Sequence, residues 1–373
     1  AALSAMGGTC EYASEIDENA SRIYLRNWGI KPAGDITLAA NEGKMDVPSH
    51  DVLVGGFPCQ PFSKSGKQLG MDEARGTLFW NIAKIIEVHK PKLVLLENVR
   101  NISGPRHTHE WEVIIQTLRD LGYRVSEDPH VVSPHLIKPE FGGRPQVRER
   151  VFIAATLIPK GLPNFKSNVE IPDLSPVTSG WDPQSWNLEK HLPLDKLKST
   201  EEKSAVALSK DEKDWIEAWN EFVLLMREKL GDSSLPGFPI WVDAWPPVGL
   251  IKNGSDLPGW KQDFIVKNQE FYLSHQKVLD KWLSKWDFLD DFPPSRRKFE
   301  WQAQNAETLW ECIMHLRPSG IRAKRHTYVP ALVAITQTSI VGKNRGTKRR
   351  LSVREGARLQ GFPEWFNFYD QKD

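Results

Sequence analysis

The first 160 residues alternate short apolar runs with longer amphipathic stretches, and this alternation constrains the fold more than any other feature of the chain. Strands are expected at residues 10–13, 52–54, 93–96 and 151–155, and helices at residues 18–27, 78–88 and 111–121. Pro91 and Gly122 are typical stop signals after two of these helices. Strands that alternate with helices predict a parallel sheet with helices on both faces, which binds ligands at its strand ends.

After residue 157 the sequence becomes rich in Pro, Ser, Asn and charged residues, and no two-residue period returns until about Ala331. Eleven of the fifteen tryptophans lie in this region, including two pairs at i,i+4 spacing, Trp215 with Trp219 and Trp282 with Trp286. We interpret these pairs as the core of a helical insertion, and the alternative is a surface on which bases stack.

The chain is expected to return to its first domain near the end. A short helix is predicted in residues 351–365, ended by Gly361 and Pro363. The sequence therefore predicts three parts: an α/β domain at 1–157, a smaller inserted domain with a Trp-rich helical insertion at 158–350, and a return segment at 351–373 that packs on the first domain.

The composition excludes several classes of protein. A chain of 373 residues that is 40% hydrophobic can bury the core of one large domain or two ordinary ones. Its apolar runs are far shorter than the ~20 residues of a bilayer span, and residues 1–20 do not resemble a signal peptide. Three cysteines, Cys10, Cys59 and Cys312, are too few and too scattered for a disulfide framework or a paired-cysteine zinc site, which favours a reducing cytoplasm.

The net charge of +1 hides an uneven distribution. Residues 312–354 hold ten Lys or Arg and no Asp or Glu. A segment this basic in a nearly neutral chain is typical of a surface that faces phosphates, and the alternative is an ordinary solvated face.

The most specific local feature is residues 55–63, Gly-Gly-Phe-Pro-Cys-Gln-Pro-Phe-Ser, which directly follow the strand expected at 52–54. Two glycines and two prolines fix an unusual backbone path. Cys59 on such a loop would be an accessible thiol, and the alternative is a buried, inert cysteine in a tight turn.

Two further motifs bring charge to strand ends. Residues 97–99, Glu-Asn-Val, end the third expected strand and would place a carboxylate at the same sheet edge as Cys59, unless Glu97 is only a helix cap or a surface residue. Residues 144–150 carry arginines at alternating positions of an extended segment. Such arginines can grip a carboxylate, a phosphate or a base carbonyl, and the alternative is that they guard an edge strand.

Five segments, in this order, resemble motifs of the DNA cytosine-5 methyltransferase family of bacterial restriction-modification systems: residues 56–63, 75–79 (Arg-Gly-Thr-Leu-Phe), 97–99, 146–150 (Gln-Val-Arg-Glu-Arg) and 358–363 (Arg-Leu-Gln-Gly-Phe-Pro). The resemblance covers about residues 1–157 and 317–366. It implies a Rossmann-like, S-adenosylmethionine-dependent α/β methyltransferase fold. The first domain would be catalytic and the inserted domain would recognise the target sequence.

The resemblance also implies a set of catalytic roles. Carbon 5 of cytosine is a poor nucleophile until a thiolate adds at carbon 6, and Cys59 would supply that thiolate. Glu97 would protonate the ring nitrogen N3. Asn98 would hold the loop around Cys59, and Arg148 and Arg150 would bind the cytosine O2 or position Glu97. No metal is needed.

This family swings the target base out of the duplex, because the base cannot be reached inside it. The loop after Cys59 would close over the DNA and occupy the vacated space through Gln60, Ser63, Ser65 and Gln68. Base-edge contacts are expected in residues 322–350, and especially 336–339, where Gln, Thr and Arg can read the major groove.

S-adenosylmethionine is the cofactor that the resemblance implies. Glu15 follows the first expected strand, where an acid binds ribose hydroxyls in nucleotide-binding folds. Asp35 would contact the adenine, although by itself it would be interpreted as a turn residue. The full set of expected cofactor-binding residues is Glu15, Ile16, Asp35, Ile36, Pro58 and Leu78.

Two departures from the family concern cofactor binding. The chain starts beyond the Phe-x-Gly-x-Gly loop with which the family begins, and Gly7-Gly8 is not that loop. Nothing after Trp365 matches the Gly-Asn segment with which the family ends. We therefore expect a fragment that binds S-adenosylmethionine weakly, and the alternative is a partner subunit that supplies the missing ends.

The sequence thus predicts an enzyme that methylates carbon 5 of cytosine in a specific duplex DNA sequence. This modification would protect the DNA from a cognate restriction endonuclease, a functional rather than a physical partner. We expect a monomer without a membrane partner, in the bacterial cytoplasm with the nucleoid. One alternative is a cytosine-5 methyltransferase of transfer RNA, against which the long middle region argues. Another is a catalytically silent DNA-binding remnant, against which the intact Cys59, Glu97 and Arg148 argue.

Overall fold

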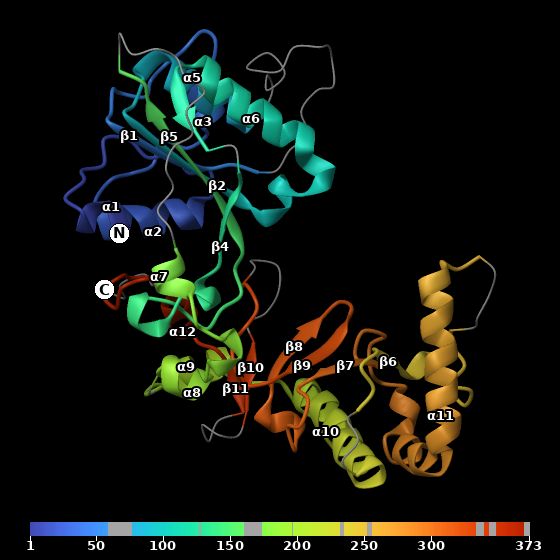
Figure 1. The fold of residues 1–373 in the computed structure, drawn as a ribbon. Helices are drawn as coiled ribbons and strands as arrows, with labels where there is room; N and C mark the ends of the chain where they lie inside the picture. Colours follow the sequence, from blue (N-terminus) through green and yellow to red (C-terminus); the bar gives the residue numbers. More distant parts are fainter. Residues whose placement is uncertain are drawn as a thin grey trace. The chain divides into compact units, whose positions relative to one another are not determined.

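The computed structural model describes residues 1–58, 77–126, 128–159, 174–195, 197–231, 235–251, 256–332, 339–342 and 348–368. The chain divides into two compact units (Figure 1). Unit 1 comprises Ala1–Gly143, Arg148–Trp181 and Phe362–Asp373, and unit 2 comprises Arg144–Val147 and Asp182–Gly361.

Unit 1 is built on a five-stranded sheet in the order β1-β2-β5-β3, in which β4 also pairs with β5. The strands are β1 (Val52–Gly56), β2 (Leu93–Val99), β3 (Tyr123–Val125), β4 (His130–Val132) and β5 (Arg150–Leu157). β1 and β2 are parallel, whereas β5 is antiparallel to β2, β3 and β4. The strands expected at 52–54, 93–96 and 151–155 are therefore confirmed.

The expectation of a parallel sheet is wrong for β5. Two consecutive strands can pair in parallel only if a crossover connection of a dozen or more residues, usually a helix, joins them. Between β4 and β5 the chain instead forms two short 3₁₀ turns, η3 (Pro134–Leu136) and η4 (Pro139–Phe141). The chain therefore comes straight back beside β4, and β5 enters the sheet in the antiparallel direction.

The strand expected at residues 10–13 is also wrong. Cys10 and Glu11 are exposed, and within the described part of the chain this segment pairs with no strand. Cys10 Sγ lies 3.2 Å from the hydroxyl of Tyr24. The backbone of the segment bonds to the rest of unit 1 through Ala13 O, which accepts from Ala33 N at 2.8 Å. A strand requires a ladder of such bonds, which this segment does not form.

The helices of unit 1 begin and end where local signals predict. α2 (Glu18–Trp28) starts after Asp17, whose side chain accepts a bond from the first turn, and ends at Gly29, which has a φ of 70°. α5 (Leu78–His89) and α6 (Thr108–Asp120) follow β1 and β2. The three expected helices are thus confirmed.

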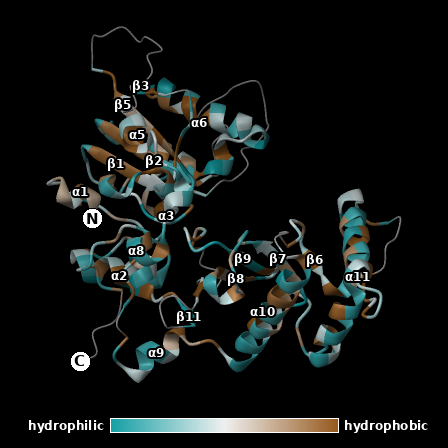
Figure 2. Ribbon diagram, turned by 60° about the horizontal axis from the view of Figure 1, so that its bottom comes forward, coloured by the Kyte–Doolittle hydropathy of each residue, from teal (hydrophilic) through white to brown (hydrophobic). Residues whose placement is uncertain are grey.

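The core of unit 1 lies between the sheet and α5 and α6. Ile82 and Ile86 of α5 are buried with Val94 and Leu96 of β2 and Ile114 of α6. β1, β2 and β5 are coloured as hydrophobic in Figure 2, and their alternate residues, such as Leu53, Val94 and Ile153, are buried in this core. The remaining described elements of unit 1 are α1 (Ala2–Ala5), α3 (Ile36–Ala39), α7 (Ser175–Thr178), η1 (Arg100–Ser103) and η2 (Pro105–His107).

Unit 2 contains a six-stranded sheet in the order β11-β10-β8-β9-β7-β6. The strands are β6 (Ile240–Trp241), β7 (Lys298–Gln302), β8 (Ile313–Arg317), β9 (Gly320–Lys324), β10 (Ile340–Val341) and β11 (Arg349–Arg350). The expectation that no two-residue period appears before about Ala331 is therefore wrong. β7 alternates polar residues with aromatic ones, but over only five residues, and so short a run gives a weak two-residue period.

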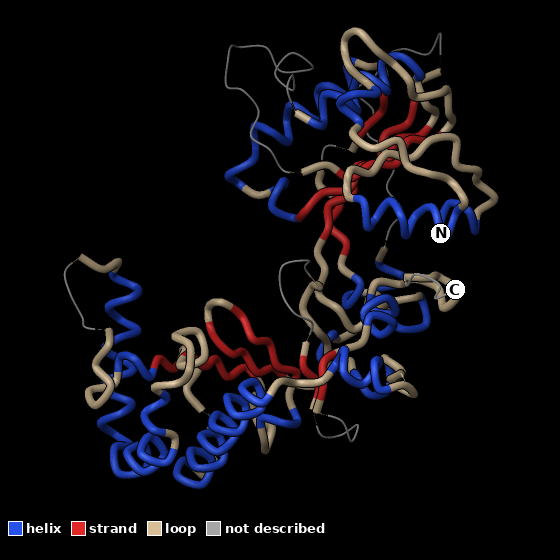
Figure 3. The backbone as a smooth tube through the Cα atoms, turned by 180° about the vertical axis from the view of Figure 1, so that it is seen from behind, coloured by secondary structure: helices blue, strands red, loops and turns tan. Residues whose placement is uncertain are grey.

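Two long helices, α10 (Lys210–Leu230) and α11 (Gly259–Lys285), pack with one face of this sheet (Figure 3). The ring of Trp219 stacks on Phe299 of β7 with centroids 4.8 Å apart, and Trp282 Nε1 donates to Ala218 O at 2.9 Å. Both tryptophans are buried, and their i±4 partners pack against the same core. The interpretation of the tryptophan pairs as core residues is thus confirmed. None of the described helices combines the length and the apolarity that a bilayer span needs.

The helix expected within residues 351–365 is confirmed as α12 (Val353–Leu359), which belongs to unit 2. Ser352 and Glu355 form a capping box at its start, and Glu355 also binds Arg349 in a buried ion pair of 2.7 Å. The remaining described elements of unit 2 are α8 (Leu188–His191), α9 (Thr200–Val206), η5 (Pro183–Ser185), η6 (Val242–Ala244), η7 (Asp287–Leu289) and η8 (Leu309–Glu311).

His315 on β8 should make the stability of unit 2 depend on pH. Burial, followed by the cations around it, lowers the pKa of His315 from its ordinary value of 6.5 to about 4. The folded state therefore favours the neutral imidazole, and unfolding between these pH values takes up a proton. We expect the free energy of unfolding to fall as the pH drops from about 6.5 to about 4, by up to ~3 kcal/mol.

This prediction is tested by urea unfolding of the wild-type protein and His315→Gln at steps between pH 4 and pH 7. The variant should lose this part of the pH dependence, because it has no imidazole to protonate. An equally steep dependence in both proteins would show that other groups cause it.

Candidate active site

The ends of β1 and β2 meet at one edge of the sheet in unit 1. The two strands are parallel, and their register places Gly56 opposite Glu97. Phe57 follows β1 and is buried, with its ring 5.4 Å from the ring of Phe79 on α5. This contact anchors the backbone immediately before Pro58. Cys59 comes next in the chain and lies outside the described residues.

The carboxylate of Glu97 is held between Gly56 and Arg150. Its Oε1 lies 2.7 Å from Arg150 Nε, and the two side chains are 37% and 20% exposed. Its Oε2 lies so close to Gly56 that a Cβ on that residue would be 3.3 Å from it. Glycine at position 56 therefore makes room for the carboxylate, and the sheet edge presents a partly exposed acidic group.

Asn98 ties the end of β2 to the segment that leads into the cysteine loop. Its side chain is 2% exposed, and its Nδ2 donates to Phe57 O at 3.0 Å. Its Oδ1 accepts a bond of 2.8 Å from Val99 N. Both ends of this buried amide are therefore satisfied, and they hold the backbone of both strand ends in place.

Arg148 and Arg150 lie two residues apart at the start of β5. Glu149 between them binds Arg100 instead. The backbone N–H of Arg148 donates to Ser133 Oγ at 3.0 Å, next to β4. Burial, and then the proximity of Arg150, lowers the pKa of Arg148, whereas Glu97 raises it. These shifts leave a guanidinium cationic at neutral pH.

The interpretation of these arginines as guards of an edge strand is excluded. β5 pairs with β2 on one side and with β3 and β4 on the other, so it is an interior strand. The register places Val99 opposite Arg150, which brings the arginine beside the end of β2. The charges at this edge therefore face one another rather than an open sheet edge.

Four of the six expected cofactor residues, Glu15, Ile16, Asp35 and Ile36, lie on two neighbouring segments that are joined by hydrogen bonds. Ala33 N donates to Ala13 O, and Ser14 Oγ donates to Gly34 O at 2.5 Å. Glu15 and Asp35 each directly follow a residue of these hydrogen bonds, Ser14 and Gly34. One oxygen of Glu15 accepts from Asp17 N, and one oxygen of Asp35 accepts from Thr37 N. The second oxygen of each acid has no partner among the described residues.

The other expected cofactor residues differ in their surroundings. Ile36 and Leu78 are partly buried against the core of unit 1, whereas Ile16 is 73% exposed and Pro58 is exposed. Asp35 caps α3, so its interpretation as a turn residue is compatible with the structure. Gln60, Ser63, Ser65 and Gln68 lie in residues 59–76, outside the described part of the chain.

The structure adds residues that the sequence did not indicate. Gly56 accommodates the Glu97 carboxylate, and Ser133 holds the backbone of Arg148. The glycine belongs to a recognised motif, but its close approach to Glu97 requires the register of β1 and β2. No local signal identifies Ser133, because its position depends on the pairing of β4 with β5. Across the described residues, no cluster of three or more His, Cys, Asp or Glu side chains could hold a metal ion.

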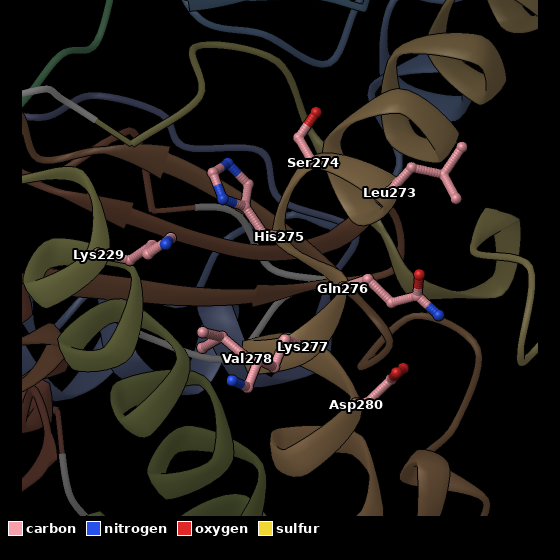
Figure 4. A pocket seen from close by; sticks show the side chains of 8 residues that line it. All are labelled: Lys229, Leu273, Ser274, His275, Gln276, Lys277, Val278 and Asp280. Carbon is pink, nitrogen blue, oxygen red and sulfur yellow. The ribbon is translucent and has the colours of Figure 1, made fainter.

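A hollow of about 520 Å³ in unit 2 lies at a kink of α11 (Figure 4). The helix departs from helical geometry at His275, next to Ser274, whose hydroxyl donates to Glu270 O at 2.8 Å. Lys229 of α10 also lines the hollow, and burial followed by this lysine lowers the pKa of His275. None of the sequence motifs contributes to the lining, so the hollow is separate from the candidate site.

Comparison with known proteins identifies the family. A sequence model described as C-5 cytosine-specific DNA methylase matches residues 1–373. The type II methyltransferase M.AluI of Cellulosimicrobium cellulans is 43% identical over 443 aligned positions, which cover 100% of this chain and 84% of that protein. The type II methyltransferase M.HhaI of Haemophilus parahaemolyticus is 39% identical over 165 residues, 44% of this chain and 47% of that protein. A prophage-encoded DNA modification methyltransferase structure from E. coli has a TM-score of 0.42 and 16% identity, and the match covers 96% of this chain and 84% of that one.

The match over the whole chain and the 43% identity establish the class of enzyme. The chain belongs to the C-5 cytosine-specific DNA methylase family, and its activity is the methylation of carbon 5 of cytosine in DNA. The family resemblance and the α/β methyltransferase fold expected from five short motifs are thus confirmed.

Asn98→Ala should destabilise unit 1. The substitution removes the bond to Phe57 O and leaves this carbonyl without its partner, which typically costs about 1–3 kcal/mol. Urea unfolding measures the change, and Asn101→Ala is the control, because Asn101 is exposed in η1. Equal stability of the two variants would contradict the anchoring role of Asn98.

Proposed function

We propose that this chain transfers a methyl group from S-adenosylmethionine to carbon 5 of a cytosine in a specific duplex DNA sequence, with Cys59 as the nucleophile. The observation that carries the proposal is the register of Gly56 with Glu97. It places a carboxyl group beside the backbone that leads into Pro58 and Cys59. A thiol and a carboxyl at one strand edge are the two groups that addition to a cytosine ring requires.

The first step is the addition of the Cys59 thiolate to carbon 6 of the flipped cytosine. A carbon–sulfur bond forms, and the ring electrons move toward N3. Glu97 gives N3 a proton, so the product is a neutral enamine with a nucleophilic carbon 5. Arg150 holds Oε1 of Glu97, and Oε2 beside Gly56 is therefore the oxygen that carries the proton.

S-adenosylmethionine, when bound, would supply an electrophilic methyl group to carbon 5 and leave as S-adenosylhomocysteine. Glu97 takes its proton back from N3. A base removes the proton from carbon 5, the double bond to carbon 6 re-forms, and the carbon–sulfur bond breaks to release Cys59 as a thiolate. Arg148 and Arg150 bind the cytosine O2 or hold Glu97 in place, and both are cationic beside its carboxylate. Asn98 positions the loop through Phe57 O.

The described residues at the proposed cofactor site fit a ribose and an adenine. Glu15 and Asp35 each offer a carboxylate oxygen that can accept bonds from hydroxyl or amino groups. The segments that carry them are linked by hydrogen bonds. Ile36 and Leu78 offer apolar surface at the same core, and Ile16 and Pro58 complete the proposed set.

DNA contacts and the choice of target sequence are assigned to further parts of the chain. Gln60, Ser63 and Ser65 contact the DNA from the loop after Cys59. Residues 1–157 form the catalytic domain, residues 158–350 recognise the target sequence, and the last segment returns to the catalytic domain. The enzyme protects DNA from a cognate endonuclease, a role supported by relatives that are named type II methyltransferases. We further propose a monomeric state and a location in the bacterial cytoplasm.

Cys59→Ser should abolish most of the activity. We expect methyl transfer from labelled S-adenosylmethionine to duplex DNA to fall by a factor on the order of a thousand or more, because a serine hydroxyl is a weak nucleophile at neutral pH. Cys10→Ser is the matched control, because Cys10 is exposed. Transfer to transfer RNA in preference to DNA would contradict the proposal, and so would DNA binding without transfer to either substrate.

Gly56→Ala should slow methyl transfer about tenfold while leaving DNA affinity unchanged, because a small displacement of a catalytic group is costly. The new Cβ would stand 3.3 Å from Glu97 Oε2 and would displace the carboxyl group. Gly55→Ala is the matched control, because its Cβ would meet Ile82 Cδ1 at an ordinary distance of 3.5 Å. Single-turnover rates measure the effect, and equal rates for the two variants would count against Glu97 as the proton donor.

A further inference from the structure

The Lys and Arg residues of the basic segment, residues 312–354, differ in their surroundings. Three pair with carboxylates of α10 and α12: Lys348 with Glu217, Arg349 with Glu355 and Arg350 with Glu212. These pairs connect β11 and its approach to α10 and α12, so their cations serve the packing of unit 2. The arginines of β8 and β9 instead share a carboxylate of β7.

Arg317, Arg322 and Lys324 project from one face of the sheet in unit 2. Ile321 and Ala323 alternate with the cations of β9 and are fully buried in the core with α10 and α11. The cations therefore point away from the two helices. Arg317 and Arg322 keep 25% and 32% of their side chains exposed.

A single carboxylate on β7, that of Glu300, serves both arginines. Its Oε2 lies 2.5 Å from Arg317 Nη2 and 3.0 Å from Arg322 Nε. Lys324 adds a third cation, and burial followed by Arg322 lowers the pKa of this lysine, whereas Glu300 raises it. We refer to Arg317, Arg322, Lys324 and Glu300 as the cationic face.

The cationic face has donors in excess of its acceptors. Arg317 Nε and Arg322 Nε are both buried and have no hydrogen-bond partner among the described residues, although Arg322 Nε lies within ion-pair distance of Glu300. Like charges that are partly removed from water repel one another, and an anionic ligand would relieve this repulsion. The known substrate of the family, DNA, is such a ligand and carries both phosphates and base-edge acceptors.

We propose that the cationic face is a DNA-contacting surface of unit 2, on which Arg322 reads the major-groove edge of a guanine and Lys324 binds a phosphate. Glu300 Oε2 lies 3.0 Å from Arg322 Nε in an ion pair, which leaves the two terminal nitrogens of the guanidinium for the fork that matches guanine O6 and N7. Lys324 is a compact point charge, which suits a phosphate. This inference rests on the proposed function only in assigning target recognition to this part of the chain.

The test is a binding selection with the full chain. The protein is equilibrated with duplexes of random sequence, the bound duplexes are sequenced, and affinities are measured at several salt concentrations. Arg322→Lys keeps the charge but loses the fork, so we expect the preference for guanine at one position to fall by about tenfold to a hundredfold. Its affinity for random DNA should not change.

Lys324→Ala should weaken binding to all sequences alike and reduce the salt slope by about one. Lys285→Ala is the control, because Lys285 is a cation of α11 that pairs with Glu221 of α10. It should change neither the selected motif nor the salt slope. Unfolding midpoints equal to wild type confirm that each variant is folded.

The proposal is overturned if Arg322→Lys retains the selected motif, if Lys324→Ala retains the salt slope, or if the wild-type protein selects no motif. The selection measures binding without methyl transfer. If Cys59 is not the nucleophile, the binding selection still tests the cationic face. If the cationic face does not bind DNA, the proposed role of Cys59 is unaffected.

Discussion

The parallel pairing of β1 with β2 is the constraint on which the rest of the site depends. It sets Gly56 against Glu97, and a slip of one residue would turn the Glu97 side chain toward the opposite face of the sheet. Burial of Leu53 and Leu96 on the core side opposes such a slip. The bond from Asn98 to Phe57 O then fixes the two strand ends together. Ordinary core packing and one buried amide thus position a charged group.

The second constraint is the direction of β5. As an interior antiparallel strand it begins beside the end of β2, so Arg150 reaches Glu97 from the adjacent strand. The sheet of unit 2 also has one face for packing and one face for charged residues. One side of its sheet is apolar and packs with α10 and α11, whereas the other presents Arg322 and Lys324. In both units, alternation along a strand places packing on one face and charge on the other.

The sequence predicted the elements that have strong local signals, such as α2 between Asp17 and Gly29 and the apolar strands β1 and β2. It also predicted that Glu97 lies at the strand edge that leads into Cys59. It could not predict the direction of β5, because an apolar run looks the same in parallel and antiparallel pairing. The strands of unit 2 were missed because they are short and alternate aromatic with charged residues. The contact of Ser133 with Arg148 depends on pairing between distant segments, which local pattern does not encode.

Addition of Cys59 to the target base is tested most directly by trapping Cys59 on duplex DNA in which 2-pyrimidinone replaces the target cytosine. This ring accepts a thiolate at carbon 6 without any methyl donor, so the measurement isolates the first step. A denaturation-resistant complex should form with the wild-type protein, form on the order of tenfold to a hundredfold more slowly with Glu97→Gln, and be absent with Cys59→Ser. A complex that persists in Cys59→Ser, or forms at an unchanged rate in Glu97→Gln, would contradict the account.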